Sequence, residues 1–591
     1  MLDTERKTFD VAIVGGGIGG STLGSILARH GISTVLIEAG SHPRFTIGES
    51  TVSETTLGFR ALAQKYDVPE IRNLTTHGKL RRHVSTGSGI KRNFSFVWHE
   101  EGERFRATQC TQVPTWSPPI GPDSHFLRQD VDAYMYQVAL SYGAVGVTNS
   151  PVTGVDFDAD GATLHTANRG DYRAKFVVDA GGMKSVLGEQ LQLRVDPEFK
   201  TRSRTIFSHF VGVEPFDSIA PPRSEHKMPS PFAEGTLHHM FKGGWAWVIP
   251  FDNHVNSTSK LCSVGINLDI DQYPMRDGET PEEEFWAHIR RFPDFYAQMK
   301  NAQAVRPFVA STRSQFSSRQ LVGERWCLLP HASDFIDPLF SSGLAVTGLS
   351  LIALGQRLID AVREDDFSVD RFEYVQTWTK NAFAYYDTLV SNSYTAFDDF
   401  ELWNAWHRVW ALGTIYGSSV QIQAVFAYEK TKDRRAFEVL EQQPYRGAQA
   451  IDNPAHATLM RTASAIMQDY RDKDIEAPEA ARRIYTAIAD SGLSPGPMKM
   501  LDPECRNPAR TFSLLPLLRL IVWGRFNSPP HVRGKFFTVI VQVAVQETLR
   551  FYGAELKRSG TNVYQATRDM FVVGNRDWHR MGSRRRQRAV R

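Results

Sequence analysis

The sequence predicts an α/β protein that opens with a Rossmann-like nucleotide-binding domain and ends in a mainly α-helical region. Two observations predict this fold. A short apolar, β-branched run at residues 9–14 is followed at once by the glycine-rich loop of residues 15–20 and then by helically spaced apolar residues. From about Asp370 onward, Phe372, Val375 and Trp378 are spaced for one face of a helix.

A chain of 591 residues is too long for one ordinary domain. We expect a large catalytic domain at residues 1–370, a helical C-terminal domain at 371–570 and a basic tail at 571–591. Contents of 41% hydrophobic and 23% charged residues are typical of a soluble globular protein. The net charge of +3 does not indicate a nucleic-acid surface.

The chain shows no sign of export or of a membrane span. The first ten residues include Asp3, Glu5, Arg6, Lys7 and Asp10, where a signal peptide needs an apolar core. Later apolar stretches are broken by charge, as at Arg519 and Glu547, so none is expected to cross a bilayer. The four cysteines lie far apart, which suggests neither a zinc site nor a disulfide framework. A cytoplasmic location follows from these features.

The glycine loop predicts dinucleotide binding, because each glycine has a geometric task at the start of a helix. Gly15 permits the turn, Gly17 lets the backbone approach a pyrophosphate, and Gly20 lets the helix pack closely on the strand. A second buried strand at residues 34–37 ends in Glu38, which is placed to accept hydrogen bonds from a ribose. The predicted contacts of this unit are Gly15, Gly16, Gly17, Gly19, Gly20 and Glu38.

Residues 243–250 read Gly-Gly-Trp-Ala-Trp-Val-Ile-Pro. Trp245 and Trp247, two positions apart, suit a strand that carries both indoles on one face, and Pro250 ends it because proline donates no ladder hydrogen bond. Taken alone, this pattern favours an ordinary aromatic-faced core strand.

Together with the nucleotide loop, this Trp-x-Trp-x-Ile-Pro pattern resembles the flavin-dependent halogenases. Stretches at residues 235–241, 261–265 and 402–410 resemble the branch with monodechloroaminopyrrolnitrin 3-halogenase and tetracycline 7-halogenase. The resemblance covers roughly residues 8 to 530. It implies an FAD-binding domain of the flavin monooxygenase and halogenase type with an inserted β-sheet substrate region, and a C-terminal helical domain that caps the substrate.

The resemblance also implies particular flavin contacts. The segment ending in Glu49 and Ser50 resembles the one beside the isoalloxazine, and Arg128 matches a flavin donor of the family. A polar loop, and an ion pair of Arg128 with Asp130 or Asp132, are the ordinary alternatives. These matches indicate FAD as the cofactor.

Residues 334–344 resemble the flavin and halide loop of the family. Small residues at the start of a helix create an anion site, because their backbone amides are free and the helix dipole favours negative charge. We therefore expect chloride on the amides of Ser342 and Gly343, with Asp337 and Leu344 on the flavin side. The alternative is a plain serine N-cap.

Lys91 is the predicted catalytic residue, because residues 88–96 resemble the strand that bears the catalytic lysine in this branch. The alternation around it otherwise favours a lysine on the polar, exposed face of a continuous strand. Lys79 is the competing candidate, outside the matching segment. Trp245 and Trp247 are assigned by the resemblance to a barrier between flavin and substrate.

The chemistry implied by the resemblance starts from reduced FAD and oxygen, which give a flavin hydroperoxide that chloride converts to hypochlorous acid. Lys91 then hydrogen-bonds that oxidant or is chlorinated to a chloramine. A separate flavin reductase supplies the reduced cofactor. No metal is expected, because His238 and His239 are adjacent on a strand and point to opposite faces.

The main alternative is an FAD-dependent aromatic hydroxylase, and a flavin-binding protein without catalysis is a further one. Gly181 occupies the position of an acid that hydroxylases use with NADPH, which argues against an internal nicotinamide-driven cycle. Phe340 replaces the Glu of the tryptophan halogenases, as in phenol- and pyrrole-halogenating relatives. The predicted substrate is therefore a free, electron-rich aromatic natural product, a phenolic polyketide or a pyrrole.

Overall fold

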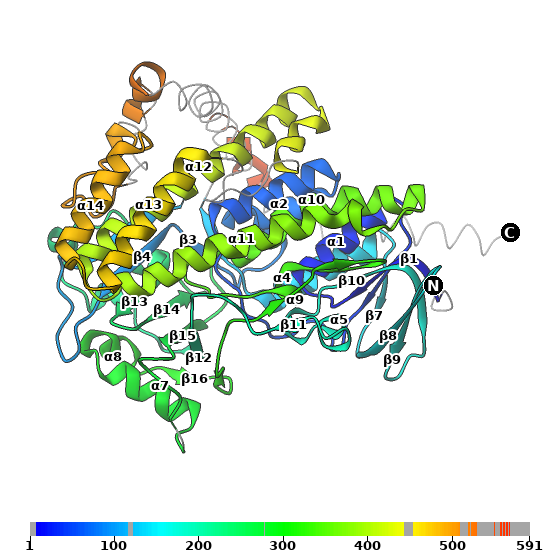
Figure 1. Ribbon diagram of the computed structural model, residues 1–591, viewed down its shortest axis with the longest axis horizontal. Helices are drawn as coiled ribbons and strands as arrows, with labels where there is room; N and C mark the ends of the chain where they lie inside the picture. Colours follow the sequence, from blue (N-terminus) through cyan, green and yellow to red (C-terminus); the bar gives the residue numbers. More distant parts are fainter. Residues whose placement is uncertain are drawn as a thin grey trace.

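In the computed structural model, two large sheets lie under a layer of long helices (Figure 1). The structure describes residues 7–115, 122–276, 278–441 and 453–508, most of 518–528 and scattered positions from 549 to 567. The basic tail predicted at residues 571–591 lies outside the described residues. The observed mixture of sheets and C-terminal helices is the predicted α/β class.

The first sheet is the predicted nucleotide-binding sheet. Strand β1 is parallel to both β2 and β10, which places the glycine loop at the carboxyl ends of its central strands. In spatial order its strands are β19 (Val322–Gly323), β20 (Trp326–Leu328), β10 (Tyr172–Asp179), β1 (Thr8–Val14), β2 (Thr34–Ile37) and β7 (Val145–Val147), and β8 (Val152–Asp158) and β9 (Gly161–Thr166) extend it from β10.

The second sheet is the inserted one, and its strands are mainly antiparallel. Their order is β16 (Gln303–Ala304), β12 (Ser203–Val211), β15 (Cys262–Asp269), β14 (Gly244–Pro250), β13 (Thr236–Phe241), β4 (Asn93–Trp98) and β5 (Cys110–Pro114), with β17 (Val309–Ala310) beside β12. Two small sheets pair β3 (Gly89–Lys91) with β6 (Asp123–His125) and β11 (Arg194–Val195) with β18 (Ser317–Ser318).

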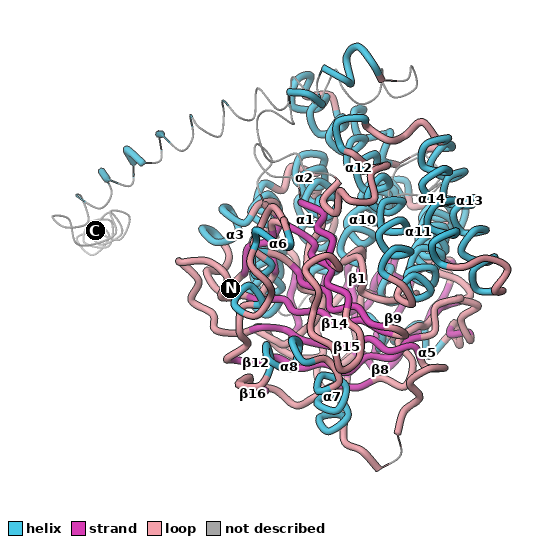
Figure 2. The backbone as a smooth tube through the Cα atoms, turned by 90° about the vertical axis from the view of Figure 1, so that its left-hand side faces the viewer, coloured by secondary structure: helices cyan, strands magenta, loops and turns pink. Residues whose placement is uncertain are grey.

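The α-helices divide into those interleaved with the strands and a C-terminal group. The first group is α1 (Ile18–Arg29), α2 (Ser53–Lys65), α3 (His77–His83), α4 (Arg128–Ser141), α5 (Val186–Gln190), α6 (Arg223–His226), α7 (Pro281–Arg290), α8 (Pro293–Met299) and α9 (Pro330–Ser333). The second is α10 (Gly343–Glu364), α11 (Val369–Ala396), α12 (Phe400–Thr431), α13 (Pro454–Arg471) and α14 (Ala477–Asp490). Figure 2 shows α10 to α14 together above the strands.

Each face of the second sheet packs on a different hydrophobic core. One face carries Trp245 and Trp247 into the core shared with the long helices. The other carries Ala246 and Val248 onto Phe285 of α7 and neighbouring residues of α8. Because side chains alternate along a strand, the two-residue spacing of the Trp pair fixes which face meets the helices.

The predicted helical region after residue 370 is confirmed. Phe372, Val375 and Trp378 are all buried on α11, as their spacing predicts. On α12, Trp403 and Trp406 are completely buried. Burial of such large side chains explains why helices α11 and α12 are long, since each contributes apolar surface to one continuous core.

Among the described residues, helix α10 is the one element that is long and apolar enough to cross a membrane, a possibility not expected from the sequence. Within its 22 residues, a window of 18 has a mean hydropathy of 1.3. In the structure 78% of the apolar stretch is buried inside the protein. The helix is apolar because it packs against α1, α2 and α11.

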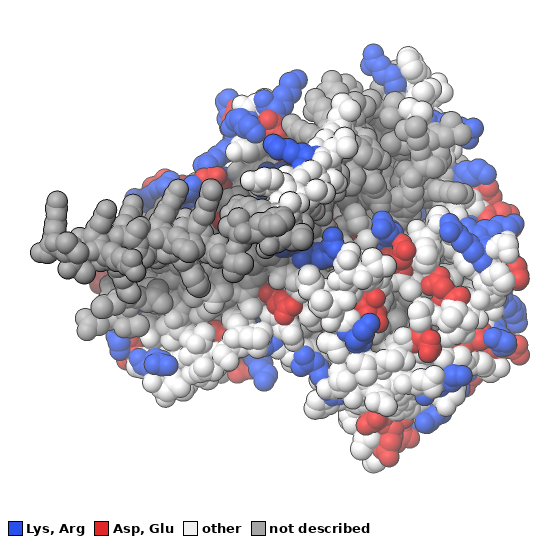
Figure 3. All heavy atoms as spheres, turned by 180° about the vertical axis from the view of Figure 1, so that it is seen from behind, with Lys and Arg blue, Asp and Glu red and all other residues white. Residues whose placement is uncertain are grey.

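Charged side chains of both signs are mixed on the face shown in Figure 3. Exposed ion pairs such as Arg173 with Asp158 and Arg371 with Asp366 are typical of this surface chemistry. Such exposed pairs contribute little to stability.

Candidate active site

The glycine loop has the geometry of a phosphate-binding turn. Gly15 has a φ of +102°, and Gly17 caps α1 without any side-chain hydrogen bond. A Cβ atom at Gly20 would lie 2.1 Å from the Gly15 carbonyl oxygen, so only glycine fits there. The first amides of α1 are therefore left for an anionic ligand.

Glu38 lies at the end of β2, directly beside this loop. Its buried carboxylate accepts hydrogen bonds from the Gly16 amide at 2.8 Å and the Gly40 amide at 3.0 Å. Burial alone would raise the pKa of Glu38, but these bonds and the charge of Arg44 outweigh it and lower the pKa below its ordinary value. Glu38 is thus held as a carboxylate, the form that accepts hydrogen bonds from ribose hydroxyls.

Polar atoms beside the loop fit a bound dinucleotide. The Arg44 Nε and the Tyr136 hydroxyl are buried and have no hydrogen-bond partner among the described residues. A Cβ atom at Gly16 would lie 3.1 Å from the Tyr136 ring. Buried polar atoms without a partner are rare in native proteins, so a ligand that bonds them is the expected explanation. Arg44 and Tyr136 were not predicted from the sequence.

Arg128, at the start of α4, holds the predicted flavin segment in place. Its guanidinium donates to Asp132 at 2.8 and 3.0 Å, which is one of the ion pairs considered from the sequence. It also donates to the carbonyl oxygens of Ile47 at 2.6 Å and Gly48 at 3.0 Å. One side chain therefore links α4 to the segment that ends in Glu49 and Ser50.

The strand around Lys91 differs from the predicted one. The expectation of one continuous strand is wrong, because Arg92 separates β3 from β4. Lys91 pairs with Asp123 in the small sheet, whereas Asn93 pairs with Pro114 in the large one. Lys91 is also completely buried, with 0% exposure, so the alternative of a lysine on an exposed strand face is excluded.

The Lys91 amino group is held by three neighbours. Nζ donates to the Ser50 Oγ at 2.6 Å and to the Thr51 carbonyl oxygen at 2.8 Å, and it lies 3.3 Å from the centre of the Phe94 ring. Because the strand breaks at Arg92, Phe94 contacts Lys91 although strict alternation would separate their side chains.

Two buried acids lie near this amine without forming an ion pair with it. Burial lowers the pKa of Lys91 well below its ordinary value, and the charges of Asp123 and Glu54 counteract this only in part. Burial also raises the pKa of Asp123 to about 6 and that of Glu54 to about 8. All three pKa values are thus displaced from their ordinary range, which is typical of functional sites.

Ser50 connects the lysine to the predicted halide loop. Its Oγ lies 3.0 Å from the Ser341 Oγ and 2.8 Å from the Thr236 Oγ1. Thr236 in turn bonds His125 at 2.9 Å. The predicted residues Lys91 and Ser50 are thus in contact. The Ser50 hydroxyl also contacts Ser341, which directly precedes Ser342 and Gly343.

Ser342 and Gly343 lie at the N-terminus of α10, as predicted. Ser342 is the N-cap but makes no side-chain cap hydrogen bond, so the plain serine cap considered from the sequence is wrong. The first intrahelical bond runs from the Val346 amide to the Ser342 carbonyl, which leaves the earlier amides without helical partners. Leu344, in the first turn, is buried.

Asp337 is buried six residues before the first residue of α10. Its carboxylate accepts hydrogen bonds from Ser203 Oγ and the Tyr394 hydroxyl, both at 2.9 Å, and from the Leu339 amide at 3.0 Å. Burial raises the pKa of Asp337 to about 6, against the effect of these bonds.

The Trp pair lies on one face of its strand, as the two-residue spacing predicts. Trp245 and Trp247 are buried on β14 with ring centres 5.9 Å apart. His238 on β13 lies 5.5 Å from Trp245, while His239 faces Phe295 on the other side of the sheet. The opposite orientation of these histidines is confirmed, and the described residues contain no group of metal-ligating side chains.

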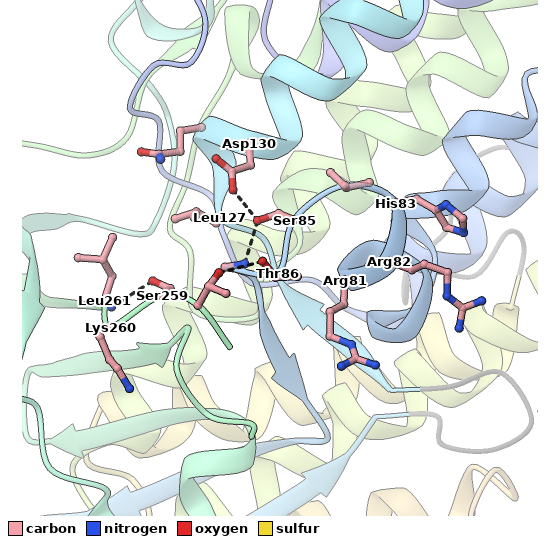
Figure 4. A pocket seen from close by; sticks show the side chains of 14 residues that line it. Arg81, Arg82, His83, Ser85, Thr86, Leu127, Asp130, Ser259, Lys260 and Leu261 are labelled. Carbon is pink, nitrogen blue, oxygen red and sulfur yellow. Dashed lines mark hydrogen bonds between the residues drawn. The ribbon is translucent and has the colours of Figure 1, made fainter. Parts of the chain in front are cut away.

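A surface pocket of about 640 Å³ lies outside this site (Figure 4). It is lined by the end of α3, the start of α4 and the loop at residues 258–261, and Arg81, Arg82 and Lys260 give it a basic character. Ser85 bonds Asp130 across it. None of the predicted site residues lines this pocket.

The structure brings the predicted residues together in two groups. Gly15, Gly17, Glu38 and their neighbours form the nucleotide end, and Lys91, Ser50 and the start of α10 form the other. Glu49 directly precedes Ser50 in the chain and accepts a 2.6 Å hydrogen bond from His209. The sequence did not predict that Glu54 and Asp123 lie near Lys91. For Glu54 a signal was present, since it is an acid within the Ser- and Thr-rich segment that follows Ser50.

A parallel sheet with the turn of a dinucleotide-binding fold, joined to a second sheet with a buried lysine, indicates a nucleotide-dependent enzyme. Two family models match the chain: residues 13–69 match the NAD(P)-binding Rossmann-like domain, and residues 101–440 match the tryptophan halogenases. The second match spans more than half of the chain and therefore establishes the family. The chain belongs to the flavin-dependent halogenases, and its cofactor is FAD.

Individual relatives agree with this assignment. The chain is 40% identical to monodechloroaminopyrrolnitrin halogenase PrnC of Pseudomonas fluorescens, over 90% of this chain and 94% of that protein. It is 38% identical to tetracycline 7-halogenase of Kitasatospora aureofaciens, over 89% and 94%. The solved structure of halogenase PltM with phloroglucinol and FAD superposes with a TM-score of 0.81 at 33% identity, over 84% of this chain and 99% of that one. The predicted family, fold, enzyme class and cofactor are confirmed.

Proposed function

We propose that this enzyme chlorinates a free, electron-rich aromatic natural product, a phenolic polyketide or a pyrrole, with Lys91 as its catalytic residue. It uses chloride, oxygen and reduced FAD supplied by a separate reductase. The observation that carries the proposal is the complete burial of Lys91, whose amine bonds Ser50 and is linked through it to Ser341 of the halide loop.

The similarity to known halogenases favours a free substrate. The relatives at 40% and 38% identity are named for monodechloroaminopyrrolnitrin and tetracycline, and their names include no carrier protein. A chlorinase named for a substrate on a peptidyl carrier protein is only 28% identical, over 63% of this chain. The PltM complex contains phloroglucinol, a free phenol.

Each end of the site has its own task in this proposal. Gly15, Gly17 and Glu38 hold the adenosine and pyrophosphate part of FAD, and Arg128 holds the segment against the flavin. Bound FAD supplies the oxidising chemistry that turns chloride into hypochlorous acid. The amides of Ser342 and Gly343 bind the chloride at the start of α10. Remaining contacts proposed for FAD are Gly16, Gly19, Gly20, Glu49, Ser50, Asp337 and Leu344.

Lys91 carries the chlorine to the substrate. Burial lowers the pKa of Lys91, which increases the share of neutral amine, the nucleophilic form. That amine and hypochlorous acid give a chloramine and water, and the chloramine then transfers chlorine to one ring carbon and returns the amine. Hydrogen bonds to Ser50 and Thr51 fix the position of Nζ and therefore the carbon that reacts.

Trp245 and Trp247 keep the substrate away from the flavin, so that the oxidant meets halide and does not hydroxylate the ring.

Residues 1–370 form the catalytic domain, residues 371–570 cap the substrate, and the enzyme is cytoplasmic. The aromatic face of α12 supports the capping role, because Trp410 lies 5.2 Å from Phe94, the ring that contacts Lys91.

The test is mass spectrometry of phenol and pyrrole panels incubated with the enzyme, FAD, a flavin reductase, NADH and chloride. We expect a chlorine isotope doublet that Lys91→Met abolishes, because methionine keeps the volume but has no amine. Lys79→Met, on α3 and outside the site, is the matched control and should retain activity.

A gain of one oxygen, or NADPH oxidation by the enzyme alone, would instead support the hydroxylase alternative. Equal chlorination by Lys91→Met and the wild type would refute the role of Lys91.

A further inference from the structure

Glu54 is a buried acid with one carboxylate oxygen left unpaired. It lies in the first turn of α2 with 0% exposure. Its Oε1 accepts a hydrogen bond from the Ser418 Oγ at 3.1 Å, whereas its Oε2 has no partner among the described residues. Leaving a buried carboxyl oxygen unpaired is costly, so this atom is expected to meet a ligand.

The facing side of α12 offers further polar atoms that lack partners. Trp410, Ser418 and Gln421 lie on one face of this helix by their spacing. The Trp410 indole N–H and both amide atoms of Gln421 are buried and have no hydrogen-bond partner in the described part of the chain. Glu54 and this face of α12 therefore form a polar lining inside an otherwise aromatic core.

This polar lining adjoins the catalytic lysine. The Trp410 ring lies 5.2 Å from Phe94 in an edge-to-face arrangement, and Lys91 Nζ lies over Phe94. On the other side, the Thr51 carbonyl that bonds Lys91 is three residues before Glu54. A ring that is chlorinated at Lys91 is thus within reach of a substituent contact with Glu54.

The flavin loop provides no acid for this task. Phe340 stands where tryptophan halogenases carry Glu, and its ring packs 4.8 Å from Trp410. Asp337, the nearest acid of the loop, is already occupied by Ser203, Tyr394 and the Leu339 amide. An acid–base group for the substrate must come from another element, and α2 supplies one.

We propose that Glu54 is a second catalytic residue, which takes the proton of a phenolic hydroxyl on the substrate. This inference rests on the proposed function, and it makes the substrate class a phenol. The contact favours phenols because a ring without a hydroxyl leaves the Glu54 Oε2 unpaired.

The proton and electron balance closes over one turnover. Glu54 carboxylate takes the hydroxyl proton and leaves a phenoxide, whose electron pair adds through the ring carbon to the chlorine on Lys91. The N–Cl bond breaks, its electron pair stays on nitrogen, and nitrogen takes the proton held by Glu54. The ring proton then moves to the phenolic oxygen, which gives the chlorophenol, the amine and the carboxylate.

The surroundings of Glu54 suit this role. The titratable groups that face it are Asp123 on β6 and Lys91 on β3, while α12 contributes only the neutral Ser418 and Gln421. Burial raises the pKa of Glu54 to about 8, so the base form becomes available as pH rises through that value.

The test compares wild type with Glu54→Gln, which keeps the shape and the Ser418 contact but cannot take a proton. Equilibrium binding of phloroglucinol and of its trimethyl ether to the FAD-loaded enzyme is measured first. We expect Glu54→Gln to weaken phloroglucinol binding by about tenfold and to leave the ether unaffected. Glu70→Gln, at a half-buried acid that bonds Tyr142, is the matched control.

Chlorination kinetics provide the second readout. In the wild type kcat/KM should rise with pH through about 8, and Glu54→Gln should lose both this limb and most of its rate. Glu54→Asp should keep the limb at a lower rate, which separates an acid–base role from a folding defect. Glu54→Gln with wild-type phenol binding and an unchanged pH limb would overturn the inference. A wild type that binds phenol selectively but yields no chlorinated product would overturn the proposed function alone.

Discussion

Replacing Asp337 by Asn should make the protein more stable at neutral pH. Asp337 is buried and accepts hydrogen bonds from Ser203, Tyr394 and the Leu339 amide. In Asp337→Asn the amide oxygen can still accept from Leu339, and the new NH₂ group can donate to the two hydroxyl oxygens. The substitution therefore removes a buried charge without removing the contacts.

The magnitude follows from the pKa of Asp337, which burial raises from 3.8 to about 6. A raised pKa means that the folded state prefers the neutral form, so the ionised carboxylate costs stability at any pH above about 6. The cost grows as pH rises from about 4 to about 6, where only the unfolded state loses its proton, and it reaches about 3 kcal/mol above pH 6. It should fade as pH falls through 6 and be absent below about 4, where the group is protonated in the folded and unfolded states.

The assay is urea unfolding of both proteins, without added FAD, from pH 4.5 to 8. The difference in apparent free energy of unfolding should reach up to about 3 kcal/mol in favour of Asp337→Asn above pH 7 and shrink toward zero at the acid end. Asp366→Asn is the control at an exposed acid, whose pKa Arg371 lowers to about 2, and it should not show this gain in stability. A variant less stable than wild type at pH 7.5, or a difference independent of pH, would refute the argument.

The same variant should chlorinate more slowly or bind FAD more weakly. A carboxylate that costs the fold about 3 kcal/mol is retained in natural proteins chiefly where function requires the charge. Undiminished FAD affinity and chlorination rate in Asp337→Asn would mean that the charge has no role in the flavin loop.

Two other predictions concern the nucleotide loop and a distant ion pair. Gly20→Ala should abolish FAD retention, measured by flavin absorbance, because its Cβ would lie 2.1 Å from the Gly15 carbonyl oxygen. Gly78→Ala is the control and should retain bound FAD, because its Cβ would meet no described atom within 4 Å. Glu284→Gln should cost about 3–5 kcal/mol in urea unfolding, because it leaves the buried Arg204 guanidinium without its charge partner; a loss below about 1 kcal/mol would contradict this.

The features that could be predicted from the sequence are those set by near neighbours in the chain. The glycine loop, the acid at Glu38 and the paired indoles of Trp245 and Trp247 depend on spacings of a few residues within one element. Helix α11 likewise followed from the period of its apolar residues. These elements lie where they were expected, because local geometry alone decides which face each side chain takes.

The environment of Lys91 could not be predicted in this way. Its strand ends at Arg92 because Lys91 pairs with Asp123 and Asn93 with Pro114, and both partners are distant in the chain. The alternation of polar and apolar residues predicted one exposed face and could not show that two different sheets share the segment. Burial of the lysine, its contact with Phe94 and the approach of Glu54 all follow from that break.

The partners of Lys91 explain how a buried amine can be both fixed and reactive. Its two hydrogen-bond acceptors, Ser50 Oγ and the Thr51 carbonyl, are neutral, and among the described residues no carboxylate forms an ion pair with it. A direct ion pair would have held the proton on nitrogen and suppressed nucleophilicity. Asp123 and Glu54 stay close enough to limit the fall in pKa but do not bond the amine. The neutral acceptors therefore fix the position of Nζ, while burial and the two acids set its pKa.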